Sequence, residues 1–239
     1  LENGNVLYFP NLRFLVLPEE EKFIHESSLA NGVKNISFNP NTNQVRGICE
    51  NEAAQANLSK MIQRFATQAH QLVNSYFPDY TNHLIPGRTS YRPAEIKGRQ
   101  SSYRKDDTRL HVDSFPSTPN QGKRLLRVFT NINPHGHPRV WRIGESFENV
   151  AQKFLPQIKS PLPGSSAFLK LFGITKSVRT PYDHYMLNLH DTMKADLNYQ
   201  NNVDQIHFDF PAMSTWIVFT DQVSHAAMSG QHMLEQTFY

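Results

Sequence analysis

The feature that most restricts the fold is a series of short segments rich in β-branched and aromatic residues. Each segment is bounded by Pro, Gly, Asn or Asp, which is the pattern of a strand between turns. We expect strands over residues 6–9, 13–17, 109–112, 125–131, 205–210, 215–219 and 233–238. The segments do not alternate regularly with helices, and no glycine-rich phosphate loop follows a strand, which disfavours a doubly wound α/β fold. The sequence therefore predicts a mainly β sandwich.

Helices are expected to flank this β structure. Between Glu52 and Tyr76, apolar residues recur every three or four positions, which predicts a long amphipathic helix. A second amphipathic helix is expected from Tyr182 to about Leu197, with shorter ones over residues 146–155 and 165–172. No stretch approaches 18 consecutive apolar residues, so no membrane-spanning helix is expected.

The 239 residues are enough for one hydrophobic core, and we expect a single domain over residues 1–239. In this view, residues 1–84 provide N-terminal strands and the long supporting helix, and residues 85–239 form the β core. The only cysteine, Cys49, cannot form an internal disulfide and suits a reducing compartment. The chain begins at Leu1 rather than Met, so we expect a missing N-terminal piece, and an upstream signal or anchor stays open.

Positive charge is concentrated between Ile85 and Arg142. Twelve Lys and Arg stand there against four Asp and Glu, an excess of eight positive charges in a chain of net charge +3. Such an excess attracts anionic ligands, although a solvated basic face gives the same count. Nucleic acid is not expected as a partner, because the stretch lacks a long basic helix and the sequence pI of 8.9 is too low.

A candidate metal site comes from His111-Val112-Asp113 and the distant His225. Two imidazoles and one carboxylate on one face are the ligand set of mononuclear non-haem iron. In jelly-roll oxygenases, His-x-Asp follows one strand and the second His arrives much later on another. The segment before His225 reads as turn, buried strand and turn, which suits that second His. The alternative is three unrelated polar residues at strand ends.

A second match, His207-Phe208-Asp209, shows that the tripeptide alone is weak. His207 and Asp209 stand fewer than twenty residues before His225, on what we expect to be the adjacent strand. This separation is too short for the usual wrap of a jelly roll. We therefore interpret the pair as structural, or as support for the residues that hold the metal.

Oxygenases of this class use 2-oxoglutarate, whose far carboxylate needs a buried base, best a bidentate Arg. Many have that base about ten residues beyond the second His, where this chain has Glu235 and no later Lys or Arg. Arg127 is the best candidate, since its neighbours in the expected strand are mostly apolar. Thr237 could add a hydroxyl group. The alternative is that Arg127 lies on an exposed strand face.

Longer blocks of sequence resemble the Kdo 3-hydroxylase family. They are His111-Val-Asp-Ser-Phe-Pro-Ser, Arg124-Leu-Leu-Arg-Val-Phe-Thr-Asn-Ile-Asn-Pro, Pro138-Arg-Val-Trp-Arg-Ile-Gly-Glu, Tyr185-Met-Leu-Asn-Leu-His-Asp-Thr-Met-Lys and Phe219-Thr-Asp-Gln-Val-Ser-His-Ala-Ala-Met-Ser-Gly-Gln. The resemblance spans roughly residues 88–238. It implies a double-stranded β-helix (a cupin-like jelly roll) that uses Fe(II), 2-oxoglutarate and O2.

The resemblance also implies a substrate. The family hydroxylates C3 of 3-deoxy-D-manno-oct-2-ulosonic acid (Kdo), a sugar of the inner core of bacterial lipopolysaccharide that is carried on lipid A (Kdo-lipid A), with succinate and CO2 as by-products. His111, Asp113 and His225 match the iron ligands, and Arg127 is the best match for the base that holds 2-oxoglutarate. We expect a cytoplasmic enzyme, peripheral to the anionic inner membrane.

Basic residues near the metal motif are candidates for contacts with the anionic substrate. We expect Tyr103, Arg104 and Lys105 to contact sugar or phosphate, with Arg92, Lys97 and Arg99 as further candidates; each could equally be an ordinary surface residue. Arg139 and Arg142, which bracket Trp141, fit either this role or a structural stack.

Three alternatives remain open from the sequence. The first is a 2-oxoglutarate oxygenase that acts on another small molecule, lipid or protein. The second is a non-catalytic jelly-roll carbohydrate-binding module, in which the three candidate ligands never meet. The third is a zinc hydrolase, although such sites prefer an additional His or Glu ligand.

Overall fold

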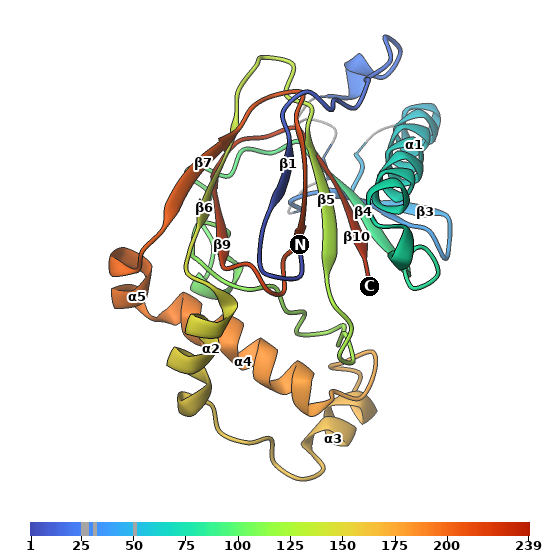
Figure 1. The fold of residues 1–239 in the computed structure, drawn as a ribbon. Coiled ribbons are helices and arrows are strands. Elements are labelled where there is room, and N and C mark those ends of the chain that lie inside the picture. Colours follow the sequence, from blue (N-terminus) through green and yellow to red (C-terminus); the bar gives the residue numbers. More distant parts are fainter. Residues whose placement is uncertain (25–28, 31–32, 50–51) are drawn as a thin grey trace.

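The computed structural model describes residues 1–24, 29–30, 33–49 and 52–239, which form two antiparallel sheets flanked by helices (Figure 1). The larger sheet has the order β1 (Leu7–Phe9), β8 (Thr215–Phe219), β5 (Leu126–Asn131), β10 (Met233–Phe238), β4 (Pro86–Arg92), β2 (Ile36–Asn39) and β3 (Gln44–Arg46). The smaller sheet has the order β7 (Ile206–Phe210), β6 (Arg139–Ile143) and β9 (His225–Ser229). This is the expected jelly-roll architecture. Strands from residues 1–84 and from residues 85–239 share the larger sheet, which supports our proposal of a single domain.

The central strands of the larger sheet are buried on both faces. Along β5, Leu126 and Val128 face one core cluster, and Phe129 faces a second cluster between the two sheets. The same alternation holds in β8, where Ile217 faces the first cluster and Trp216 the second. A strand covered on both sides needs apolar residues at nearly every position, which explains the continuous apolar runs in the sequence. Residues at odd positions of β5 therefore point into the space between the sheets.

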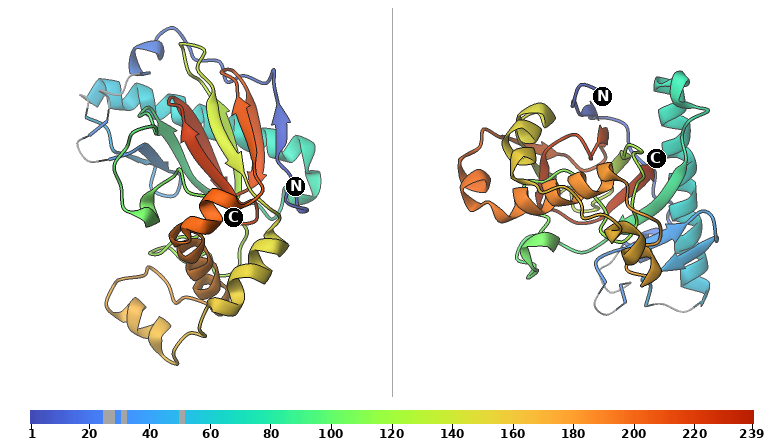
Figure 2. Two further views of the ribbon diagram at one scale, coloured as in Figure 1. Left: turned by 90° about the vertical axis from the view of Figure 1, so that its left-hand side faces the viewer. Right: turned by 90° about the horizontal axis from the view of Figure 1, so that it is seen from below.

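Helix α1 (Glu52–Tyr76) covers the outer face of the larger sheet (Figures 1 and 2). Its apolar side chains join the first core cluster, as the three- and four-residue spacing predicts; the buried ones are Leu58, Met61, Ile62, Phe65, Ala69 and Val73. The helix ends before Phe77-Pro78, because the residue before a proline is pushed out of the helical conformation. Its bounds agree with the prediction. The burial of this face stabilises the helix and leaves the inner face of the sheet free for a site.

Four further helices gather at one end of the two sheets (Figure 1). They are α2 (Phe147–Phe154), α3 (Ser165–Leu171), α4 (Pro181–Ala195) and α5 (Leu197–Asn202). Helix α4 begins at a capping box, in which Thr180 and Asp183 bond each other's backbone N–H groups. Short 3-10 turns occur at Glu21–Phe23, Pro78–Tyr80, Tyr103–Lys105 and Leu155–Gln157. Among the described residues, no helix is long and apolar enough to cross a bilayer.

Two expected strands are wrong. Residues 13–17 have no regular secondary structure and pair with neither sheet, and their apolar pattern reflects the burial of Phe14 against Phe65 of α1. Residues 109–112 touch a strand at one position only, where His111 and His225 exchange both backbone hydrogen bonds. Conversely, β2, β3, β4 and β6 were not expected, because polar side chains interrupt their apolar pattern.

Candidate metal centre

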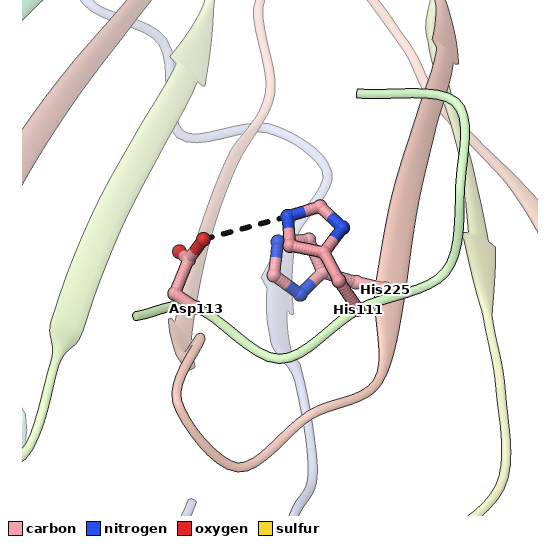
Figure 3. Close-up of side chains that lie close together, drawn as sticks. All are labelled: His111, Asp113 and His225. Carbon is pink, nitrogen blue, oxygen red and sulfur yellow. Dashed lines mark ion pairs between the residues drawn. The ribbon is translucent and has the colours of Figure 1, made fainter. Parts of the chain in front are cut away.

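His111, Asp113 and His225 lie together between the two sheets (Figure 3). Backbone pairing fixes all three: His111 bridges His225 at the start of β9, and the Asp113 N–H donates to the Thr220 carbonyl at 2.8 Å. One ligand atom from each residue lies within 4.8 Å of the others, and His111 Nε2 is 3.5 Å from Asp113 Oδ1. The alternative in which the three residues are unrelated is therefore wrong.

Both imidazoles are prepared to bind a metal through Nε2. His111 Nδ1 lies 2.7 Å from the Arg109 carbonyl, and His225 Nδ1 lies 2.8 Å from the Val223 carbonyl. A carbonyl only accepts, so each Nδ1 carries the proton and each Nε2 keeps its lone pair. Burial lowers the pKa of His111 to about 3 and also lowers the pKa of His225. Two neutral imidazoles result, as metal ligation requires.

Asp113 supplies the negative charge of the cluster. Burial by itself would raise its pKa, but the charge of the Arg127 guanidinium holds the pKa well below the usual value. Asp113 Oδ2 is buried and accepts no hydrogen bond, although Arg127 Nη1 lies 3.2 Å away. A buried, unsatisfied carboxylate oxygen beside two imidazole lone pairs is a site for a cation, which would relieve its desolvation cost.

A small polar cavity opens beside the triad, and three arginines line it: Arg92 of β4, Arg127 of β5 and Arg139 of β6. Glu235 of β10 lies in the same cavity and pairs with Arg127 at 3.1 Å and with Arg92 at 2.7 Å. The position that holds a base in many oxygenases thus carries a carboxylate here. The basic groups come instead from β5 and β4, the two strands that flank β10.

Arg139 differs from the other two arginines. Its side chain is buried, its Nη1 donates to the Gly230 carbonyl at 2.7 Å, and its Nε has no hydrogen-bond partner. No carboxylate of the described residues lies within ion-pair distance of it, unlike Arg92 and Arg127. Burial, together with the charge of Arg92, lowers the pKa of Arg139 to about 9. A buried cation with no carboxylate at ion-pair distance favours an anionic ligand at this point.

The other expected site residues lie farther from the triad. Thr237 is buried on β10 opposite Arg127, but it does not line the cavity. Tyr103, Arg104 and Lys105 form a 3-10 turn on the surface, where Arg104 pairs with Asp191 of α4 at 2.8 Å.

Outside the cavity, Lys97 is exposed and Arg99 lies 3.6 Å from Asp107. His207 and Asp209 are exposed on β7, and β6 separates that strand from β9. The interpretation that they support the metal ligands is therefore wrong, and so is the expectation that their strand lies next to the strand of His225.

Sequence patterns alone did not single out Arg139, Trp141 or His190 as residues of the site. On β6, Arg139 and Trp141 face inward, and the Trp141 ring stacks on His225 with centroids 5.0 Å apart. Arg142, which follows Trp141 on β6, does not line the cavity and donates to the Thr108 carbonyl at 2.6 Å. The ring of His190 on α4 lies nearly perpendicular to the His111 ring, with centroids 5.2 Å apart. Only the strand alternation could have separated Arg139 from Arg142.

Comparison with known proteins decides the family. The family model of 3-deoxy-D-manno-oct-2-ulosonic acid (Kdo) hydroxylase matches residues 1–239. This chain belongs to the Kdo hydroxylase family. The chain is also similar to solved structures of the Kdo hydroxylase KdoO, a non-heme Fe(II) and alphaketoglutarate-dependent dioxygenase. The KdoO complex with cobalt(II) matches it with a TM-score of 0.97 at 53% sequence identity. The match covers 100% of this chain and 80% of that one.

Two other KdoO structures contain the ligands of the reaction. The complex with alphaketoglutarate and Fe(III) matches with a TM-score of 0.96, and the complex with succinate and Fe(III) with 0.95, both at 52% identity. Each match again covers 100% of this chain and 80% of the KdoO chain. A comparison with curated protein sequences found no match. Membership in this family excludes the binding module and the zinc hydrolase as functions.

Proposed function

We propose that this Kdo hydroxylase oxidises C3 of Kdo in Kdo-lipid A, with His111, Asp113 and His225 as its iron(II) ligands. The observation that carries the assignment is the cluster itself: two neutral imidazoles with free Nε2 atoms face an ionised carboxylate within 4.8 Å. This donor set fits iron(II), because it fills one face of the ion and leaves the other face open.

The cosubstrate 2-oxoglutarate would fill the cavity beside the metal. Its far carboxylate would pair with Arg139, whose Nε lacks a partner, and with Arg127, whose Nε is also buried without one. Arg92 and Glu235 would hold Arg127 in place, since Glu235 contacts both arginines. Thr237 pairs with Arg127 across the two strands, so its side chain would lie beside the arginine on the same face of the sheet.

The protein's own groups orient the reactants and exclude water. When bound, iron(II) with 2-oxoglutarate and O2 supplies the oxidising power that hydroxylates the C–H bond and releases succinate and CO2. Trp141, Phe129, Ala227 and Met233 form the apolar part of the cavity wall. They keep the reaction away from bulk water. No side chain needs to act as a general acid or base.

The substrate would approach from the side of the basic 3-10 turn Tyr103–Lys105. Arg104 is largely exposed there and shares Asp191 with His190, the residue whose ring contacts His111. A Kdo carboxylate or a lipid A phosphate is a suitable partner for Arg104 and Lys105. Because lipid A is membrane-borne, we propose peripheral contact with the anionic cytoplasmic face of the inner membrane.

The test is a mass spectrum of Kdo-bearing lipid A after incubation with the protein, iron(II), 2-oxoglutarate and air, with succinate measured in the same tube. One oxygen added to Kdo, matched by succinate, supports the proposal, and the Asp113→Ala variant should give neither product. Succinate without oxidised Kdo would retain the oxygenase and reject this substrate. Full activity of the Asp113→Ala variant with added iron(II) would reject the ligand assignment.

A further inference from the structure

Apolar side chains gather on one exposed segment, residues 155–178, which runs from the end of α2 through α3 to the start of α4. Seven of the fifteen large apolar side chains that are exposed in the described chain lie in this segment. Five of them expose between 54% and 81% of their surface: Leu162, Phe168, Leu171, Phe172 and Ile174. Scattered exposed apolar residues are ordinary, but a cluster of this density marks an interaction surface.

The shape of the segment separates it from the core. In Figures 1 and 2, α3 lies at the helical end of the molecule and projects beyond α2 and α4. On α3, the rings of Phe168 and Phe172 lie 4.3 Å apart and form one apolar ridge with Leu171. Because the ridge projects from the rest of the molecule, it could enter the surface of a bilayer without contact by the flanking elements.

The charged side chains of the segment itself are all positive. No Asp or Glu occurs between Glu148 and Asp183, whereas Lys159, Lys170 and Lys176 are exposed in this interval. Apolar and basic side chains together, without acidic ones, are the composition of a protein surface that lies in the headgroup region of an anionic bilayer. A second copy of the chain is a poorer occupant, because the lysines of two identical ridges would repel each other.

The segment is connected to the metal centre through the chain that follows Asp113. The Lys176 N–H donates to the Ser117 carbonyl at 2.9 Å, and Arg179 Nη2 donates to the Pro116 carbonyl at 2.5 Å. These bonds fix the connection between α3 and α4 to residues only three and four positions beyond Asp113. Helix α4 itself continues to His190, whose ring contacts His111. The ridge and the site therefore belong to one supported region of the molecule.

We propose that residues 155–178 form a docking surface for an anionic lipid bilayer. Leu162, Leu171 and the Phe168–Phe172 pair enter the headgroup region, and Lys159, Lys170 and Lys176 contact lipid phosphates. Docking holds the metal centre close to a sugar carried on a lipid. This last consequence rests on the proposed function, whereas the docking itself does not.

The test is co-sedimentation of the full chain with vesicles of phosphatidylethanolamine and phosphatidylglycerol, compared with vesicles of phosphatidylcholine. We expect binding to the anionic vesicles that weakens with salt. The double variant Leu171→Ser/Phe172→Ser should weaken it by at least about tenfold, since two side chains leave the lipid. Lys170→Gln and Lys176→Gln should each weaken it about fivefold.

A matched control tests position rather than apolarity. Leu197→Ser/Ile206→Ser removes two side chains of comparable exposure, 59% and 66%, from α5 and β7, and should leave binding unchanged. Absence of wild-type binding to anionic vesicles overturns the proposal, and so does unchanged binding of Leu171→Ser/Phe172→Ser. A variant that alters the mass of the protein in solution without altering vesicle binding would assign the ridge to self-association and also overturn it.

A soluble acceptor separates this proposal from the proposed function. Leu171→Ser/Phe172→Ser should oxidise a short water-soluble Kdo glycoside at the wild-type rate, because neither residue lines the cavity. The same variant should lose turnover of Kdo-lipid A in vesicles. If the wild type binds vesicles but oxidises neither acceptor, the proposed function fails and the docking surface stands.

Discussion

Replacing Arg139 with Met tests which arginine holds the cosubstrate. The substitution keeps a long apolar side chain in the buried site and removes the guanidinium. Burial lowers the pKa of Arg139 from 12.5 to about 9, which at about 1.4 kcal/mol per pH unit corresponds to roughly 5 kcal/mol of uncompensated cost. A carboxylate that relieves about half of this cost contributes roughly a hundredfold in affinity.

We therefore expect Arg139→Met to raise the 2-oxoglutarate KM about a hundredfold, with little change in metal affinity. Initial rates of succinate formation measure the first quantity, and titration of the protein with cobalt(II), followed by its absorption spectrum, measures the second. Arg127→Met is the matched comparison. Because Arg127 also contacts Asp113 at 3.2 Å, its loss should weaken metal binding as well.

The change in thermal stability of the unliganded protein offers an independent test, because its direction depends on whether Arg139 has a carboxylate partner. Removing a buried cation that has no carboxylate partner should leave the thermal stability of the chelator-treated protein unchanged or raise it, whereas losing an ordinary buried ion pair would lower it. An unchanged KM for 2-oxoglutarate in Arg139→Met would refute the reasoning. A large fall in the stability of the unliganded variant would show that Arg139 is structural.

Three further predictions concern the metal centre and the core. Chelator-treated protein should lose stability as the pH falls below about 6.5, the pKa of an imidazole in the unfolded chain, because His111 and His225 stay neutral in the folded protein. In denaturant titrations, the free energy of unfolding should fall by up to about 1.4 kcal/mol per pH unit for each of the two histidines. The His225→Gln variant should show a shallower slope. Asp113→Asn should abolish cobalt(II) binding without lowering helix content, and retained binding would contradict its role. Met193 is a residue of α4 that is buried in the core, and Met193→Ala should lower the free energy of unfolding by about 2–5 kcal/mol in the same titrations.

The sequence predicted the bounds of those helices and strands whose apolar residues follow a regular local pattern. Helix α1 begins and ends where its apolar periodicity does, and β8 and β10 have the bounds that their apolar runs predict. The ligand set could also be predicted, since His-x-Asp and a distant His between turn and strand form a pattern along the chain. Such features depend on neighbouring residues, which the sequence displays directly.

Strand pairing and the cavity depend on residues distant in sequence. Strand β4 is polar, Pro-Gly-Arg-Thr-Ser-Tyr-Arg, and is a strand because β10 and β2 pair with its two edges. The exposed apolar segment 165–172 was correctly expected to form a helix, but the same pattern cannot show that its apolar side chains remain uncovered. Tertiary contacts decide both cases.

The cosubstrate site shows the division most clearly. Residue type and spacing along the chain pointed to His111, Asp113, His225 and Arg127, because the chemistry of a metal ligand or a basic group is visible in the residue itself. Only the tertiary structure gave Arg127 its partners Asp113 and Glu235 and left Arg139 without a carboxylate. The physical reason is that desolvation and charge pairing depend on what surrounds a group in space, and five strands from separate parts of the chain build those surroundings.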